Sequence, residues 1–424
     1  MKVGIHTLGC KVNLYESECI LELLKKNGYE IGDFFDVCDV YIINTCTVTN
    51  TSDVKSRKII RGAIRRNPDA CVVAMGCFIE ANHSYKEQGL DIVLGNKDKS
   101  KIVSLLDEYF KNKKEIRRLY SDEFKDFEDM NIQMFEGRTR AFVKIQDGCE
   151  NFCSYCIIPF VRGKCRSKRK EDVINEIKQL VKNGFKEIVL TGIHTGNYGV
   201  DLGVSFADLL KEIVLIKGLF RLRISSIEIT ELTDEVIDVI NSSNIIVDHL
   251  HIPLQAGSDE ILKLMNRKYN LDYFKKKLEK IRTIRPKISI TTDIIVGFPN
   301  ENDELFNKTV ESALEFKFSK IHVFPYSVRS KTKASLMDNQ IDGNIKKERA
   351  RKLLEISKNL EKSYATSFIN KKMEVLIEKN TDGYSLGHTS NYLLVKIDGN
   401  YSSGEIIEVL IDDYNYPYLI GKVS

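Results

Sequence analysis

The sequence predicts an α/β protein in three parts: an N-terminal parallel α/β domain, a central partial (β/α)6 barrel and a small C-terminal antiparallel β-barrel. Short apolar runs alternate with amphipathic helical patterns over most of the chain, which is typical of parallel sheets covered by helices. After residue 370 the helical period stops, and short alternating runs are separated by turn residues, as in small barrels. The length of 424 residues is that of about three domains.

The N-terminal domain is expected to span residues 1–112. Amphipathic stretches such as Glu16–Lys26 and Val54–Arg66 separate its apolar runs, so strands and helices alternate. The expected strands are VGIHTLG, YIINT, CVVAMG and DIVLG. Residues 113–136 are highly charged with little periodicity, which indicates a linker.

The central domain is expected to span residues 137–370. Its six strand–helix units fit an open barrel or a large doubly wound sheet, and a long basic amphipathic helix follows at residues 344–369. The expected strands are AFVKIQ, EIVLTG, RLRISS, DHLHI, ISITTDIIVG and KIHVFPY. Residues 371–424 contain MEVLIEK, YLLVKID, EIIEVLID and YLIGKV between turn signals, which predicts a barrel of the oligonucleotide-binding sort.

Composition excludes several classes of protein. Hydrophobic residues make up 42% and charged residues 29%, which is ordinary for a well-cored globular chain and excludes disordered, collagen-like and coiled-coil proteins. No apolar run approaches the roughly 18 residues that span a bilayer, and the N-terminus does not resemble a signal peptide. We therefore expect a cytoplasmic protein without a membrane partner. The net charge is +4, but residues 371–424 hold 5 Lys against 8 Asp and Glu, so the basic excess lies elsewhere.

Three of the ten cysteines form a C-x3-C-x2-C pattern directly after a predicted strand, at Cys149, Cys153 and Cys156. A cytosolic chain keeps its thiols reduced, so metal binding or catalysis is favoured over disulfides. Zinc is one interpretation, but structural zinc takes four ligands, and Cys165 lies nine residues further on in a basic run. An iron–sulfur cluster usually takes four cysteines, so three would leave one iron open to a substrate. We expect the cluster.

Cys10, Cys46 and Cys77 each follow an apolar strand of the N-terminal domain. Because the carboxyl ends of parallel strands meet at one edge of a sheet, three thiols would converge there and suit a second cluster. Cys71 begins the strand that Cys77 ends, about 20 Å away at ~3.3 Å per residue, so these two cannot share a cluster. We expect Cys19, Cys38 and Cys71 to be small buried residues.

The cysteine spacing, with Tyr155 before the last cysteine, resembles that of the radical S-adenosylmethionine (SAM) enzymes. HTLGCKVNLYESE, INTCTVTNTSDVKSR and AMGC are similar to the N-terminal domain of the methylthiotransferases within that superfamily, and the C-terminal barrel resembles the RNA-binding TRAM domain. The likeness continues through LTGIHTGNYG, RISSIE, HIPLQAGSD, TDIIVGFPNE and FPYSVRSKTKA. Two residues depart from the family pattern, namely Lys331, where a glycine is usual, and Cys165.

The opening HTLGCKVN is most similar to the branch that modifies threonylcarbamoyladenosine in tRNA. This resemblance implies methylthiolation of C2 of N6-threonylcarbamoyladenosine at position 37, giving the 2-methylthio derivative, with two 4Fe–4S clusters and SAM as cosubstrate. The first cysteine group would bind SAM and generate a 5′-deoxyadenosyl radical, and the second would supply sulfur. Because the cofactors carry this chemistry, no side chain is expected to be catalytic.

The implied partners are the tRNA anticodon loop, an electron donor such as flavodoxin or ferredoxin, and a sulfur source. A methylthiotransferase acting on isopentenyladenosine-37 of tRNA or on a ribosomal protein is the alternative, and a non-catalytic iron–sulfur RNA-binding protein is a third interpretation. The residues expected to contact SAM are Tyr155, Gly192, Arg223 and Ser225. Two basic runs adjoin the predicted clusters, and the residues expected to contact RNA are Arg57, Arg61, Arg65, Arg162 and Arg166.

Overall fold

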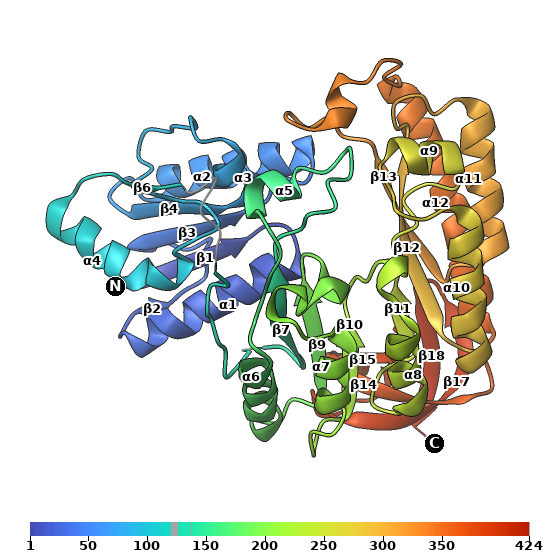
Figure 1. Ribbon diagram of the computed structural model, residues 1–424. Helices are drawn as coiled ribbons and strands as arrows, with labels where there is room; N and C mark the ends of the chain where they lie inside the picture. Colours follow the sequence, from blue (N-terminus) through green and yellow to red (C-terminus); the bar gives the residue numbers. More distant parts are fainter. Residues whose placement is uncertain (120–125, 136, 424) are drawn as a thin grey trace.

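The N-terminal part of the chain is built on a six-stranded parallel sheet in the order β2-β1-β3-β4-β5-β6, as the computed structural model in Figure 1 shows. The structure describes residues 1–119, 126–135 and 137–423. The strands are β1 (Lys2–Thr7), β2 (Glu30–Ile31), β3 (Val40–Thr45), β4 (Cys71–Gly76), β5 (Ile92–Leu94) and β6 (Ile116–Arg118). Every neighbouring pair is parallel, as the alternation of apolar and helical segments predicts.

Helices cover both faces of this sheet. Ile42 packs in a core with α1 and α4, whereas its neighbour Ile43 packs on the other face with α2. The six residues of β3 are all buried, which explains why this strand has a continuous apolar run rather than an alternating one. The helices are α1 (Lys11–Lys26), α2 (Asn50–Arg66), α3 (Cys77–Ala81) and α4 (Ile102–Asn112).

The segment predicted as a linker contributes to the structure. Strand β6 extends the N-terminal sheet beyond residue 112, and Met130, Ile132 and Phe135 are buried in a core shared by the N-terminal sheet and the central strands. The Tyr15 hydroxyl of α1 donates to the Met130 carbonyl and, over 2.8 Å, to the Glu176 carboxylate. Residues 120–125 and 136 of this segment, and residue 424, lie outside the described residues.

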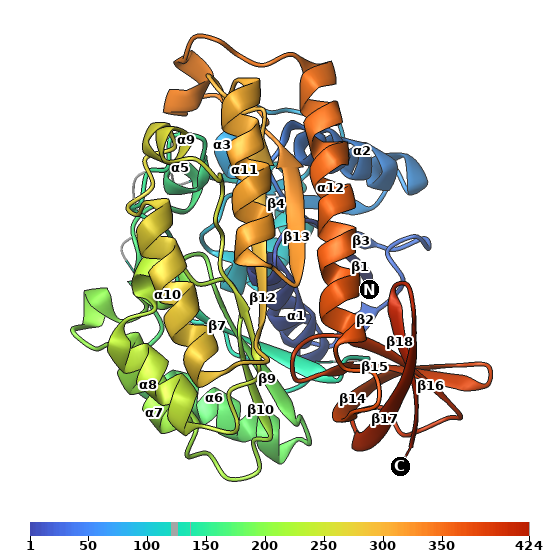
Figure 2. The same ribbon diagram turned by 90° about the vertical axis from the view of Figure 1, so that its right-hand side faces the viewer.

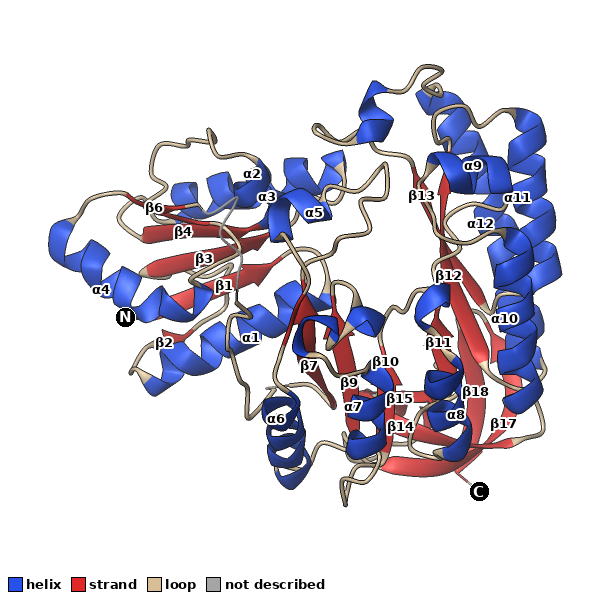
Figure 3. Cartoon of the chain, viewed as in Figure 1, coloured by secondary structure: helices blue, strands red, loops and turns tan. Residues whose placement is uncertain are grey.

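The central part contains the six expected parallel strands, arranged as a partial barrel (Figures 1 and 3). They form the sheets β10-β9-β7-β8 and β11-β12-β13, and two isolated parallel bridges, Leu222–Ile246 and Ser226–His251, link them. The strands are β7 (Arg140–Asp147), β9 (Glu187–Gly192), β10 (Arg221–Ile224), β11 (His249–His251), β12 (Ser289–Val296) and β13 (Lys320–Pro325). The short β8 (Arg166–Ser167) pairs antiparallel with β7.

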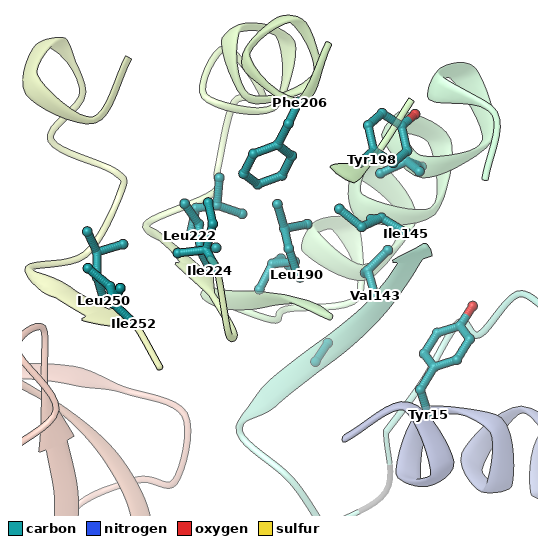
Figure 4. Close-up of a cluster of buried hydrophobic side chains, with 14 of the residues drawn as sticks. Tyr15, Val143, Ile145, Leu190, Tyr198, Phe206, Leu222, Ile224, Leu250 and Ile252 are labelled. Carbon is teal, nitrogen blue, oxygen red and sulfur yellow. The ribbon is translucent and has the colours of Figure 1, made fainter. Parts of the chain in front are cut away.

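Helices line the outside of the partial barrel, and Figure 2 shows α12 running beside β13. Figure 4 shows Phe206 of α7 above Leu190 of β9 and Leu222 of β10, in the layer between helices and strands. The helices are α5 (Ile158–Arg162), α6 (Lys170–Lys182), α7 (Phe206–Ile213), α8 (Asp234–Ser242), α9 (Asp259–Leu264), α10 (Leu271–Ile284), α11 (Asp303–Phe316) and α12 (Gly343–Thr366). None of the helices described here is long and apolar enough to cross a bilayer.

The C-terminal part is a closed barrel in the order β14-β15-β16-β18-β17, in which only β16 and β18 pair parallel. Its strands are β14 (Lys372–Thr381), β15 (Tyr384–Thr389), β16 (Leu394–Asp398), β17 (Ile406–Asn415) and β18 (Tyr418–Val423). It is attached at the first residues of central strands, because Arg221 donates to the His388 and Glu374 carbonyls and Arg140 pairs with Glu378 at 3.0 Å.

Candidate functional site: two cysteine groups beside one cavity

Cys10, Cys46 and Cys77 meet at one edge of the N-terminal sheet. Cys10 caps the start of α1, Cys46 follows β3, and Cys77 begins α3 immediately after β4. Gly9 has a φ of +101°, and a Cβ placed there would lie 2.8 Å from the Cys46 Cβ, so the chain at Cys10 passes directly over Cys46. Burial, followed by the charge of Cys77, raises the pKa of Cys46 to about 11. The three thiols therefore lie together where the carboxyl ends of the parallel strands meet.

Buried charges surround Cys77. Asn96 Nδ2 and Arg162 Nε both lie 3.4 Å from its Sγ and donate to it. The Arg162 guanidinium, fully buried, also pairs with Glu16 at 3.1 Å and with Asp147 at 3.0 Å. These two carboxylates are shared with two further buried cations, Lys99 and Lys144.

This arrangement has a positive excess, since four buried cations, Lys99, Lys144, Arg162 and Arg166, pair with two carboxylates. Although burial alone would raise the pKa of Glu16, the positive charges of Arg162, Lys144 and Lys99 hold it well below the usual range. A cysteine binds a metal through its negatively charged sulfur, and a buried cationic hydrogen-bond donor such as Arg162 suits that charge. The surroundings of Cys77 therefore fit an iron–sulfur cluster.

Cys149, Cys153 and Cys156 lie on the loop between β7 and α5. Gly148 allows the turn into this loop, because it has a φ of +76° and a Cβ there would lie 1.9 Å from the Lys164 carbonyl oxygen. The loop is fixed from two sides, since Ser154 N donates to the Met265 carbonyl and Ala334 N donates to the Ser154 carbonyl.

Polar side chains also contact these cysteines. Arg267 Nη1 donates to the Cys153 Sγ over 3.2 Å while its Nη2 pairs with Glu228, and His194 Nδ1 lies 3.8 Å from the Cys149 Sγ. Burial raises the pKa of Cys156 to about 12, and the charges of Cys153 and Cys149 act in the same direction. The three thiols are thus near neighbours.

Neither cysteine group has the geometry of a single-ion site. Within the described ranges, no three His, Cys, Asp or Glu side chains are placed so that they could hold one metal ion. The ligands of a cluster bind different irons and therefore stand further apart than the ligands of one ion.

A cavity of about 710 Å³ is lined by residues from all three parts of the chain. Its lining includes Cys10 from the N-terminal sheet, Gly192 and Ser225 from the ends of two central strands, and Tyr392 from the C-terminal barrel. A second cavity of about 200 Å³ is lined by Tyr155 and Cys156, among others. Val48 and Ile158 line both cavities, so the two adjoin. Ligand sites usually have about 300–1,000 Å³, so this space suits SAM together with a nucleoside.

Three of the four residues expected to contact SAM line these cavities, namely Tyr155, Gly192 and Ser225. Arg223 does not have the expected role. It is buried, its Nε donates to Glu187 over 2.7 Å, and its guanidinium lies 4.6 Å from the Tyr392 ring centroid. We correct the expectation that Arg223 contacts SAM, because Arg223 lines neither cavity and its guanidinium is engaged by Glu187 and Tyr392.

Two of the five residues expected to contact RNA are also placed differently. Arg162 and Arg166 are buried, and both pair with Asp147, so neither offers a surface to a phosphate. The sequence pattern was misleading because a run of basic residues usually lies on the surface. On α2, Arg61 and Arg65 are exposed and Arg57 is half-buried against the Phe78 ring, so these three remain predicted RNA contacts.

Sequence reasoning missed Arg329 as a contact between domains. Its guanidinium donates to Thr47 over 2.6 Å, to Asn50 over 2.8 Å and to Asp53 over 2.8 Å, just after Cys46. This joins the loop between β13 and α12 to the edge that carries the N-terminal cysteines. The one sequence signal that could have pointed to Arg329 is its place at the start of the RSKTKA motif.

Lys331, where the family resemblance led us to expect a glycine, has a φ of +70°. A left-handed conformation costs a residue with a Cβ roughly 1–2 kcal/mol. We therefore expect Lys331→Gly to stabilise the protein by about 1 kcal/mol, measured as a higher urea midpoint with an unchanged slope. Lys333→Gly, in the neighbouring 3-10 turn, is the control and should destabilise. Equal effects of the two changes would contradict the assignment of strain to Lys331.

Cys165, the other departure, lies beside the central cysteine loop. Asn197 Nδ2 donates to its Sγ over 3.1 Å, and its own thiol lies 3.8 Å from the Gly148 carbonyl oxygen. Cys19, Cys38 and Cys71 are buried, as expected for small apolar residues.

Comparison with known proteins finds two family matches and several full-length relatives. Residues 143–313 match the Radical SAM superfamily, and residues 2–95 match the Uncharacterized protein family UPF0004. The threonylcarbamoyladenosine tRNA methylthiotransferase MtaB of Bacillus subtilis is 45% identical, with 99% of this chain and 96% of the relative covered. MtaB of Aquifex aeolicus is 39% identical, with 97% and 100% covered. The tRNA-2-methylthio-N(6)-dimethylallyladenosine synthase of Carboxydothermus hydrogenoformans is 35% identical, with 98% of each covered.

Solved structures share the fold at much lower identity. The radical SAM methyltransferase TsrM of Kitasatospora setae, bound to tryptophan and a SAM analogue, matches with a TM-score of 0.58 at 15% identity over 79% of this chain and 75% of that one. The cobalamin-dependent SAM radical enzyme OxsB matches with a TM-score of 0.53 at 13% identity over 83% and 56%. These likenesses concern the fold alone.

Proposed function

The chain belongs to the radical SAM tRNA methylthiotransferase family, and from this premise we propose that it methylthiolates C2 of N6-threonylcarbamoyladenosine at position 37 of tRNA. The product is the 2-methylthio derivative. One observation carries the proposal: Cys10 of the N-terminal cysteine group lines the same cavity as Gly192 and Ser225, at the strand ends where a radical SAM enzyme holds its cosubstrate. A base in this cavity is within reach of both cysteine groups.

The family uses SAM and 4Fe–4S clusters. When bound, they supply the radical and sulfur chemistry that protein side chains lack. In the proposal, Cys149, Cys153 and Cys156 hold the cluster that binds SAM, while Tyr155, Gly192 and Ser225 line the space for SAM itself. Cys10, Cys46 and Cys77 hold the second cluster.

The protein's own side chains position and shield these groups. Arg162 and Asn96 donate hydrogen bonds to the Cys77 sulfur, and Arg267 donates to the Cys153 sulfur. Hydrogen bonds to the ligating sulfurs raise the reduction potential of an attached cluster. All three parts of the chain contribute residues to the lining of the cavity, so each can help to position the base.

The substrate base has to leave the stack of the anticodon loop to enter this cavity. Exposed arginines on α2, next to Cys46, are suited to hold the phosphates of the loop. The reaction also requires a one-electron donor, which we infer to be a flavodoxin or a ferredoxin, and a sulfur source. From the proposed tRNA substrate we also infer that the enzyme is cytoplasmic.

The test of this function uses reconstituted enzyme with SAM and a reductant. Anticodon stem-loops carrying threonylcarbamoyladenosine or isopentenyladenosine, and a ribosomal protein, are offered as substrates. Mass spectrometry should find the methylthio group on the threonylcarbamoyladenosine RNA. A methylthio group on the isopentenyladenosine RNA alone, or on the protein alone, would overturn the proposal in favour of that substrate.

The predicted phosphate contacts on α2 are tested by the salt dependence of tRNA binding. Each contact contributes roughly 0.7–0.9 to the slope of log affinity against log salt. Changing Arg57, Arg61 and Arg65 together to Gln should therefore flatten the slope by about 2 to 3.

A matched three-charge change on the outer helix α10, Lys275, Lys276 and Lys280 to Gln, is the control and should leave the slope nearly unchanged. If instead the α10 change flattens the slope and the α2 change does not, the RNA-binding surface would lie on the outside of the barrel at α10 rather than at α2.

A further inference from the structure

Lys11 stands out among the charged residues that line the large cavity. The other two, Lys320 and Glu361, pair with each other at 3.2 Å. The Lys11 side chain is exposed, and within the described part of the chain its ammonium makes no hydrogen bond or ion pair. A cation that lines a cavity and has no partner of its own attracts an anionic group of a ligand that enters the cavity.

The wall beside Lys11 adds to the positive charge. Arg140 and Arg223 lie near enough for their charges to act on the ammonium, and Glu187 is the nearby carboxylate that opposes them. Glu187 is already shared, since it pairs with Arg223 at 2.7 Å, with Arg221 at 3.7 Å and with Arg140 at 4.0 Å. The Arg223 Nη1 is buried without a hydrogen-bond partner among the described residues. The nearby carboxylate is therefore already engaged by arginines and does not pair with the Lys11 ammonium.

The same side of the cavity is next to the proposed chemistry. Lys11 is the first residue of α1, directly after Cys10, and α1 packs against β7 and β9 of the central barrel. Cys10, Gly192 and Lys11 line one continuous space. A ligand whose anionic group reached Lys11 would have its remaining atoms between the two cysteine groups.

We propose that Lys11 binds the carboxylate of the threonylcarbamoyl group on the substrate base, and so selects this base over adenosines whose N6 substituent is neutral. This inference rests on the function proposed above, in which that group enters the cavity. The substituent carries one carboxylate, which matches the one unpaired charge among the described lining residues. Lys11 is thus a specificity-determining residue, and neither the radical step nor the transfer of sulfur requires it.

Other anions could also reach a lysine here, and the experiment separates them. Anticodon stem-loops are prepared with threonylcarbamoyladenosine, with its neutral methyl ester, and with unmodified adenosine at position 37. Their affinities for the reconstituted enzyme are measured by fluorescence anisotropy, together with the affinity for SAM. Hydrogen bonds to charged groups predict that the wild type prefers the free carboxylate over the ester by about 10- to 100-fold.

Lys11→Met should remove this preference while changing the affinities for unmodified RNA and for SAM less than 2-fold, and Lys11→Arg should keep part of it. Lys26→Met is the matched control, because Lys26 lies at the far end of the same helix in an ion pair with Glu22, and it should keep the full preference.

Three outcomes would overturn the inference. In the first, the Lys11→Met variant keeps the preference for the free carboxylate. In the second, its affinity for all three RNAs falls equally, which would identify an RNA phosphate as the ligand of Lys11; in the third, its affinity for SAM falls, which would identify the SAM carboxylate. Failure of the proposed function would look different, since the wild type itself would neither prefer nor methylthiolate the threonylcarbamoyladenosine RNA.

Discussion

Changing Cys149, Cys153 and Cys156 together to Ala should abolish reductive cleavage of SAM and remove half of the iron. Two 4Fe–4S clusters give the reconstituted wild type about 8 irons per chain, and the variant should keep about 4 on its N-terminal cysteines. The two groups lie on separate segments, and each has its own hydrogen-bond donors, Arg267 at Cys153 and Arg162 at Cys77. Loss of one cluster should therefore leave the other in place.

The measurements are iron and sulfide content after anaerobic reconstitution, and 5′-deoxyadenosine formed with a chemical reductant. Cys165→Ala is the matched control, since this thiol lies beside the same loop but outside the C-x3-C-x2-C pattern, and it should retain all the iron. A wild-type protein with one tightly held zinc and no iron would contradict both cluster assignments.

Arg162→Met should lower the free energy of unfolding of the apoprotein by about 3–5 kcal/mol, because it removes one partner from a buried network of charges. The guanidinium is fully buried and pairs with Glu16 and Asp147, which belong to different parts of the chain. Without Arg162, each of the two buried carboxylates has one ion-pair partner fewer. The remaining cations then compensate less of the free-energy cost of burying these negative charges. Urea denaturation measures the loss.

Arg61→Met is the control for this prediction. Arg61 is exposed and pairs with Glu87 on the surface, so its loss should cost at most about 1 kcal/mol. If the two variants were equally stable, Arg162 would contribute no more than a surface ion pair, and the buried network would not hold the N-terminal part against the barrel.

Much of the fold could be predicted because its strands are buried on both faces. Consecutive apolar residues, as in YII of YIINT and VVAM of CVVAMG, indicated β3 and β4 and so the strand ends that carry Cys46 and Cys77. The strands that the sequence analysis did not predict are β2, β6 and β15. Strands β2 and β6 are short and partly exposed, and β15, with the sequence YSLGHT, has no continuous apolar run. Their pairing partners, rather than their own residues, determine their structure.

The buried charges could not be predicted in the same way. Arg162 is separated from Glu16 by 146 residues, and its position in a basic run suggested the surface. Only the fold brings these groups together and shows that the run faces inwards. The role of Lys11 was equally hidden, because it depends on which neighbouring charges are already paired.

The most direct test of the account concerns the division of roles between the two cysteine groups. A variant with Cys10, Cys46 and Cys77 all changed to Ala is supplied with SAM, a reductant and an anticodon stem-loop carrying threonylcarbamoyladenosine. Mass spectrometry then follows 5′-deoxyadenosine and the methylthiolated nucleoside together. We predict that the variant forms 5′-deoxyadenosine but no methylthiolated nucleoside, because the central cysteines remain and the sulfur-supplying group is lost. Methylthiolated product at the wild-type level would contradict the account, because the N-terminal cysteines would then have only a structural role.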